Sequence, residues 1–218
     1  TLFRSIKDVS FENLNNFHAN PQDVNDFRFE SSAKKIRVIE CLDGELVTNE
    51  IIAETLIENG NLVSNTITDV LKMTVVNRYQ DQKPAIAFIK NFNLKEGAIA
   101  SSVGHDSHNI IAVGVDDESI CKAVNAIIEA KGGICAVTNS KTHTVPLPVA
   151  GIMSDKDGET IGKQYATLDK MAKAMGCTLN APYMSLSFMA LLVIPALKLS
   201  DKGLFNGKTF QFTDLELN

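Results

Sequence analysis

The segment IIAVGVDDESICKAVNAIIEAKGGICAVT, residues 110–138, carries the pattern of a strand, a helix and a second strand. Its two ends, 110–115 and 134–138, are short apolar runs rich in β-branched residues, as in buried strands. Asp116-Asp117 can accept hydrogen bonds from the first helical turn, and Lys131-Gly132-Gly133 supplies a cation and a left-handed glycine at the helix end. Between them, apolar residues recur at helical spacing: Ile120, Ala123, Val124, Ile127 and Ile128. We predict a strand–helix–strand unit, with a right-handed crossover if its strands are parallel.

The rest of the chain adds further strands and helices without regular alternation. A second long helix is predicted over 158–174, and a short helix from Thr48 through Glu58, ended by Gly60. Strands are predicted at 36–41, 70–76, 85–89, 98–103 and 208–212. Irregular order favours an α+β fold over a doubly wound parallel sheet. We therefore expect a layered domain, with a mixed or antiparallel β-sheet and a few packed helices.

Composition excludes several classes of protein. The 218 residues include 21 Lys and Arg against 26 Asp and Glu, a net charge of -5, and 44 % are hydrophobic. So apolar a chain is not intrinsically disordered. The acidic balance argues against a nucleic-acid partner, because binding phosphates needs a basic face. Residues 1–34 hold few apolar positions and are expected to form a connection or the edge of another domain.

The cysteines and the apolar segments indicate a compartment. The four cysteines form no C-x-x-C pair, so we expect reduced, buried thiols rather than a structural zinc site. The opening residues lack the charged and apolar regions of a secretory signal. The longest apolar run, within 188–196, is far shorter than the ~20 residues of a membrane helix. We expect that run to lie in the core of a cytoplasmic protein without a membrane partner.

A polar loop, residues 104–109 (GHDSHN), interrupts two apolar strands. It contains two of the four histidines, and in a tight loop both rings and the carboxylate of Asp106 can converge. Imidazoles with a carboxylate can bind a divalent metal, or they can transfer protons near neutral pH. An ordinary hairpin turn is the alternative, since Gly, Asp, Ser and Asn are common turn residues. Spacing alone slightly favours the turn, and three polar groups rarely complete a metal site.

Other polar residues are expected to be structural. Ser102 lacks the G-x-S-x-G context of a nucleophile and should pack within its strand. His18 and His143 are expected at the surface, His143 in a turn. Gly132-Gly133 follows a helix instead of opening one, so a helix cap is favoured over a dinucleotide site. Asp155 is expected to cap the helix that follows it.

Several segments together resemble one family. Residues 97–114, GAIASSVGHDSHNIIAVG, closely resemble a signature of the microbial adenine deaminases of the amidohydrolase superfamily. Four other segments fit the same family: DGELVT (43–48), DVLKMTVVNRY (69–79), LPVAGIMSD (147–155) and APYMSLSFMALLVIPALKLSDKGLF (181–205). The resemblance extends from about Lys35 to the C-terminus. It implies an enzyme that hydrolyses adenine to hypoxanthine and ammonia.

The resemblance also implies a division into domains. Members of this family are larger, with a metal-binding (β/α)₈ barrel upstream that uses manganese or iron. The chain would then comprise residues 1–42, a linker and strands left from the upstream barrel and β-sandwich region, and residues 43–218, the C-terminal α+β domain. The family's H-x-H metal motif is not found here. We therefore expect Mn²⁺ or Fe²⁺ in the full-length enzyme, and neither metal in this stretch.

The resemblance makes the polar loop a candidate site. His105, Asp106 and His108 become candidate catalytic residues, and Ser102 and Asn109 candidate contacts for adenine. The expected partners are adenine, the upstream barrel of the same chain and further copies of the chain in a homo-oligomer, because a missing barrel leaves an apolar face exposed. The chain alone is expected to be inactive. Two alternatives stay open: a non-catalytic assembly or lid module, and a self-sufficient metalloenzyme built on the loop.

Overall fold

A computed structural model describes residues 14–217. Within them, nine strands form one mixed sheet, with the order β10-β9-β7-β8-β5-β6-β1-β14 and with β2 beside β1. All of its pairs are antiparallel except β1 with β6. The strands are β1 (Lys35–Cys41), β2 (Thr48–Glu54), β5 (Leu71–Val76), β6 (Ala85–Lys90), β7 (Ala98–Ser101), β8 (Ile110–Gly114), β9 (Gly133–Val137), β10 (Thr142–Pro146) and β14 (Glu216–Leu217). The α+β class and the mixed sheet predicted from the sequence are confirmed.

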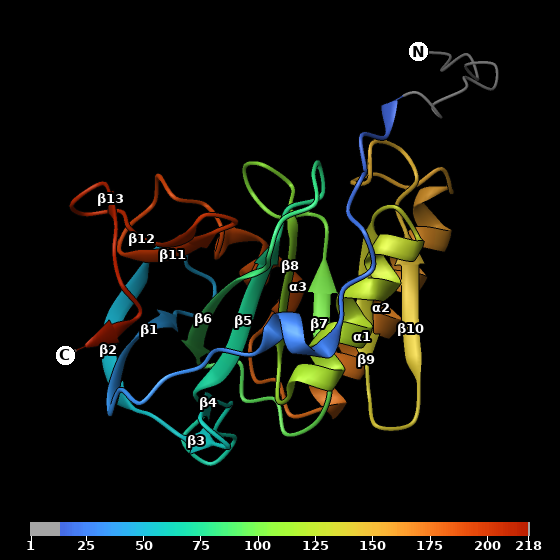
Figure 1. Ribbon diagram of the computed structural model, residues 1–218. Helices are drawn as coiled ribbons and strands as arrows, with labels where there is room; N and C mark the ends of the chain where they lie inside the picture. Colours follow the sequence, from blue (N-terminus) through green and yellow to red (C-terminus); the bar gives the residue numbers. More distant parts are fainter. Residues whose placement is uncertain (1–13, 218) are drawn as a thin grey trace.

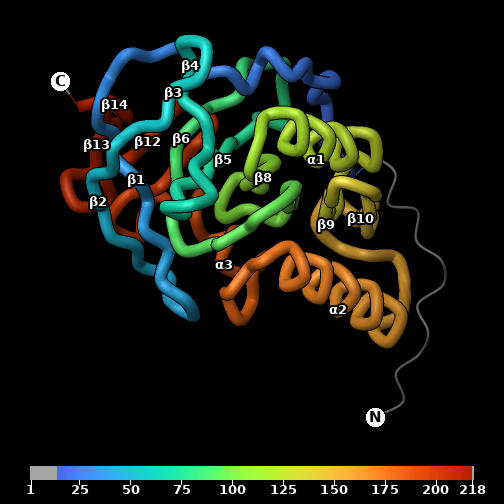
Figure 2. The backbone as a smooth tube through the Cα atoms, turned by 90° about the horizontal axis from the view of Figure 1, so that it is seen from below, coloured from blue at the N-terminus to red at the C-terminus, as the bar shows by residue number. Residues whose placement is uncertain are grey.

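Helices cover both faces of this sheet. Helix α1 (Asp117–Glu129) and helix α2 (Gly158–Ala174) lie on opposite sides of β9 and β10, as Figure 2 shows. Along β7, Ala98 and Ala100 pack with α1, whereas Ile99 packs with the core on the side of α2 and α3 (Pro182–Phe188). A strand buried on both faces is apolar at nearly every position. This explains why β7, β8 and β9 were readable as continuous apolar runs.

The strand–helix–strand prediction is confirmed in its elements. Strands β8 and β9 are both antiparallel to β7, which lies between them, so they are parallel to each other. The side chain of Asp116 accepts the N–H of Ser119 and caps α1. Gly132, with φ of 117°, donates its N–H to Ile127 O and so ends the helix. The hand of the crossover stays a prediction.

Smaller elements surround the main sheet (Figure 1). A second sheet contains β11 (Leu197–Ser200), β12 (Gly203–Asn206) and β13 (Gln211–Phe212), and a short hairpin joins β3 (Ile57–Glu58) to β4 (Asn61–Leu62). A 3₁₀ turn, η2 (Val24–Phe27), packs against α1. Strand β1 precedes the predicted domain boundary at residue 43 and pairs along its length with β2, which follows it. The boundary itself stays a prediction.

The helix predicted at 48–58 is wrong. Residues Thr48–Glu54 form β2, in register with β1, where Ile51 stands opposite Val38. Apolar residues over so short a span fit a helix or a strand equally well. The backbone groups of β1 decide between them, because a strand beside β1 satisfies its hydrogen bonds.

Three further predictions need correction. In the strand predicted at 208–212 only Gln211–Phe212 is extended, because the side chain of Asn206 accepts the N–H groups of Lys208 and Thr209 and forms a turn. The apolar run at 188–196 is only partly core, since Val193 is 58 % exposed. The helix α2 is capped by Asp157, whose side chain accepts the N–H of Thr160, and not by Asp155.

The remaining structural predictions are mixed. His18 is exposed, as expected, but His143 lies half-buried in the edge strand β10 rather than in a turn. All four cysteines are buried and unpaired. No helix within residues 14–217 combines the length and the apolar character needed to cross a membrane.

Candidate functional site

The histidine loop, Gly104–Asn109, joins β7 to β8 and is fixed at both ends. The N–H of His105 donates to Ser187 O at 2.9 Å, and that of His108 donates to Gly104 O at 2.6 Å. Asn109 is buried, and its Oδ1 accepts the N–H of Arg78 at 3.2 Å. Two of these contacts come from outside the loop, from α3 and from the turn after β5, and the third is within the loop. The loop is therefore held in one shape by its neighbours.

The structure brings the two histidine rings together. The ring centroids of His105 and His108 lie 5.6 Å apart, edge to face at 60°. The ring of His105 also stacks on Phe188 at 5.0 Å with an interplanar angle of 14°. Both histidines are half-buried, whereas Asp106 at the tip of the loop is exposed. The loop therefore presents two imidazoles side by side, with a carboxylate beyond them.

The surroundings of His108 favour its neutral form. Burial lowers its pKa below the usual value, and the nearby His105 and Arg78 lower the pKa further, while Asp106 opposes them. Nδ1 of His108 is buried and has no hydrogen-bond partner within the described residues. A neutral imidazole can accept a proton at one nitrogen and donate one at the other. His108 is thus suited to proton transfer near neutral pH.

Ser102 has a different role from the two histidines, because its hydroxyl group is bonded to the backbone. It is fully buried, and its Oγ donates to Gly151 O at 2.6 Å and accepts the N–H of Gly133 at 2.8 Å. These bonds join the end of β7 to the start of β9 and to the segment after Pro148. Ser102 is therefore occupied in holding the base of the site together.

The histidine loop does not fit a complete metal site. Within residues 14–217, no group of three or more His, Cys, Asp or Glu side chains is placed to hold a metal ion. Protein metal centres usually need at least three such ligands. The loop can supply individual polar groups, but together with the other described residues it does not supply a full ligand set.

Two residues near the loop were not singled out from the sequence. Tyr79 donates its hydroxyl to Ser107 O at 2.5 Å, and Phe188 supplies the ring under His105. Both lie inside segments that resemble the family, 69–79 and 181–205, but nothing in their spacing shows that they meet the loop. These two contacts depend on the tertiary fold, which brings together residues that are far apart in the chain.

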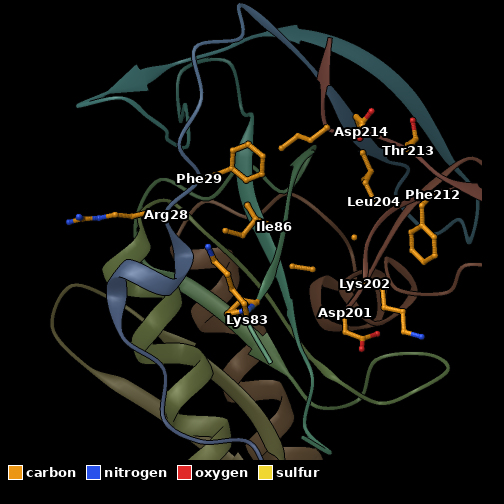
Figure 3. Close-up of a pocket in the computed structure, with 14 residues that line it drawn as sticks. Arg28, Phe29, Lys83, Ile86, Asp201, Lys202, Leu204, Phe212, Thr213 and Asp214 are labelled. Carbon is orange, nitrogen blue, oxygen red and sulfur yellow. The ribbon is translucent and has the colours of Figure 1, made fainter. Parts of the chain in front are cut away.

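A cleft of about 690 Å³ lies away from the histidine loop, between the start of β6 and the β11–β13 sheet (Figure 3). Phe29, Ile86 and Leu204 line its apolar part, and Lys83 and Asp201 add charge. No motif in the sequence predicted this cleft. None of the candidate site residues lines it, so the histidine loop is a surface feature rather than the wall of this cavity.

The chain enters this domain beside the histidine loop. The N–H groups of His18 and Ala19 donate to Arg78 O at 2.6 and 3.1 Å. In Figure 1 the turn after β5 and the loop after β7 lie at the upper end of the central strands, and the first described residues (blue) run downward from that end. The first described residues therefore lie beside the turn that contacts the histidine loop.

Comparison with known proteins places the chain in a family. The family described as "Adenine deaminase C-terminal domain" matches residues 45–211. Curated relatives named adenine deaminase include those of Sulfurovum sp., 52 % identical over 96 % of this chain and 38 % of the relative, and of Methanosarcina mazei, 53 % identical over 85 % of this chain and 34 % of the relative. The relative from Salinibacter ruber is 44 % identical over 96 % of this chain and 38 % of its own length. The chain thus spans little more than a third of these relatives, and it belongs to the adenine deaminase C-terminal domain family.

Proposed function

We propose that this chain is the C-terminal part of an adenine deaminase, which converts adenine and water to hypoxanthine and ammonia, and that its histidine loop lies at the active site. The pairing of His105 and His108 at the edge where the chain enters carries this proposal. The names and lengths of the relatives support it. We propose that an upstream part of the longer enzyme packs against the loop.

The loop residues would then transfer protons or position the groups that do so. His108, kept neutral by its surroundings, accepts a proton from the attacking water or passes one to the departing amine. The ring of His105 stacks on Phe188 and packs against the ring of His108, which it holds in place. Asp106 supplies a negative charge at the tip of the loop. Asn109 is the candidate contact for adenine, whereas Ser102 supports the loop through its backbone partners.

The other features of the enzyme belong to the upstream part or to the assembly. We assign Mn²⁺ or Fe²⁺ to the upstream barrel, because the described residues do not offer a complete ligand set. We further propose a cytoplasmic homo-oligomer that acts on a small purine, and a chain that is inactive without its upstream part.

The decisive test is substitution of the two loop histidines in the full-length enzyme. We expect His105→Ala and His108→Ala to lower kcat for ammonia release by ~10²-fold or more, as for other losses of a positioned acid or base. The wild type and His143→Ala serve as the controls, since His143 lies in β10, outside the loop. Loop variants with kcat within about twofold of the controls would rule out a catalytic loop.

A second candidate function is an assembly or lid module without catalytic residues. The region around the edge strand β2 favours it, because Leu46, Val47 and Ile52 expose apolar side chains, Ile52 by 62 %. Such surfaces often mark contacts with other protein parts. Loop variants with normal turnover but an altered oligomeric state in light scattering would favour this function over the first.

A further inference from the structure

Arg78 follows β5 and links the entering segment, Leu14–Ala19, to the histidine loop. Its backbone N–H donates to Asn109 Oδ1 at 3.2 Å, at the end of the loop. Its carbonyl oxygen accepts the N–H groups of His18 and Ala19. The backbone of this one residue thus contacts the histidine loop through its N–H group and the entering segment through its carbonyl group.

The side chain of Arg78 strengthens this link. Its guanidinium lies 5.7 Å from the centroid of the Phe17 ring, in the entering segment, and 4.9 Å from that of Tyr79. Tyr79 in turn donates its hydroxyl to Ser107 O, within the loop. The guanidinium of Arg78 therefore connects Phe17 to Tyr79, which is bonded to the loop.

The position of Arg78 is unusual for a group that serves stability alone. Arg78 is only 5 % exposed, yet among residues 14–217 its guanidinium has one hydrogen bond, from Nη1 to Ala150 O at 2.9 Å. Its Nε is buried without a partner within the described residues. Gly151 permits this packing, because a Cβ there would overlap Nη1. A buried cation with so few partners costs free energy, which suggests that its place has another use.

Arg78 also acts on His108 through its charge. The charged groups that influence His108 are Arg78, His105 and Asp106, and the positive charge of Arg78 disfavours protonation of the ring. We propose that Arg78 is a positioning residue that couples the entering segment to the histidine loop and so sets the place and charge state of His108. The catalytic consequence rests on the proposed function, but the coupling is measurable without it.

The coupling is tested by a double-mutant cycle on this chain, read by NMR titration of the histidine ring protons. Arg78→Gln is expected to raise the pKa of His108, because a neighbouring positive charge is lost. Phe17→Leu, which contacts Arg78, is expected to move the His108 titration in the wild type but to have no further effect in Arg78→Gln. Phe29→Leu is the control: Phe29 is half-buried against the apolar layer on the other side of the sheet from Phe17, and its substitution should leave His108 unchanged.

Two results would overturn the inference. One is an unchanged His108 titration in Arg78→Gln; the other is an equal effect of Phe17→Leu in both backgrounds, which would mean that Arg78 transmits nothing. If Arg78→Gln does not fold, Phe17→Leu against Phe29→Leu still decides, because only the first should move His108. Equal titrations in those two variants would reject the coupling.

Activity in the full-length enzyme separates this inference from the proposed function. Arg78→Gln is expected to lower kcat by about tenfold to a hundredfold, with a smaller change in KM, as for a displaced catalytic group. The acid limb of the pH profile should move upward with the pKa of His108. A shifted His108 with unchanged kcat would reject the catalytic loop and keep the coupling. A lower kcat with an unshifted His108 would reject the coupling and keep the loop.

Discussion

Lys198 in β11 is fully buried, and it forms no ion pair with any carboxylate among the described residues. Its Nζ donates to Leu46 O at 2.6 Å and to Phe188 O at 3.0 Å. Burial lowers its pKa from 10.5 to about 8. A neutral amine still has two N–H donors, enough for both carbonyl oxygens. Lys198 thus fixes the residue whose ring supports His105, and it does so in either charge state.

The depressed pKa of Lys198 predicts a pH dependence of stability. Between pH 8 and 10.5 the unfolded chain binds a proton at this lysine that the folded chain has lost, so the contribution of Lys198 to the free energy of unfolding rises with pH. The contribution is at most about 3 kcal/mol, from 1.36 kcal/mol for each pKa unit. Urea unfolding of the wild type and of Lys198→Met at several pH values in this window measures it.

The difference between the two proteins isolates this lysine. Burial raises the pKa of Cys135 and Cys177 to about 11, so their contribution to stability falls as pH rises above 9, opposite in sign to that of Lys198. Both cysteines are present in the variant, and their effect cancels in the comparison. Wild-type stability should rise relative to Lys198→Met from pH 8 to 10.5. Parallel curves would show that Lys198 titrates normally.

At the scale of single residues, the sequence identifies polar groups but not their partners. His105 and His108 were expected to converge because both lie in one short loop, and their rings do meet. The bonds of Ser102 reach residues 31 and 49 positions away in the chain, to Gly133 and Gly151. Local spacing predicts that Ser102 packs within its strand but carries no information about these distant partners. Its role as a contact for adenine, which only the family resemblance implies, stays a prediction.

At the scale of elements, Gly97 controls how β7 enters the sheet. Gly97 has φ of 68°, a conformation that other residues rarely adopt. A Cβ on it would overlap Val137 O at the end of β9, and its own carbonyl oxygen accepts the N–H of Val115. The residue therefore sets the spacing of β7 and β9, and its carbonyl group ties the start of β7 to the end of β8.

Substitution of Gly97 tests this role. Gly97→Ala is expected to destabilise the chain by about 2–4 kcal/mol, through backbone strain and the forced separation of β7 and β9. The control is Gly162→Ala in α2, where no atom stands within 4 Å of the added methyl group and alanine favours the helix by about 1 kcal/mol. The midpoints of urea unfolding should therefore move in opposite directions. A loss for Gly97→Ala no larger than the change in the control would show that the sheet adjusts freely.

Elements buried on both faces were predictable, and edge elements were not. Strands β7, β8 and β9 and helix α1 carry continuous or periodic apolar patterns with clear caps, so their own residues define them. Strand β2 has partly exposed residues, and its pairing with β1 decides its structure. Tertiary contacts override weak local preferences in such segments.

At the scale of the whole molecule, a single sheet separates two apolar layers. Helix α1 and η2 close one layer, and α2 and α3 close the other. The histidine loop, the turn that contains Arg78 and the entering segment meet at one edge of this sheet (Figure 1). The chain matches little more than a third of its relatives. The proposed site therefore lies beside the first described residues of the chain.

The most direct measurement is ammonia release from adenine, with manganese added, by this chain and by a chain extended upstream to the full length of the enzyme. We expect ammonia from the extended chain only, because the described residues of the shorter one do not form a complete metal site. Ammonia release by the shorter chain alone would contradict this expectation. A complete active site would then have to lie within these 218 residues.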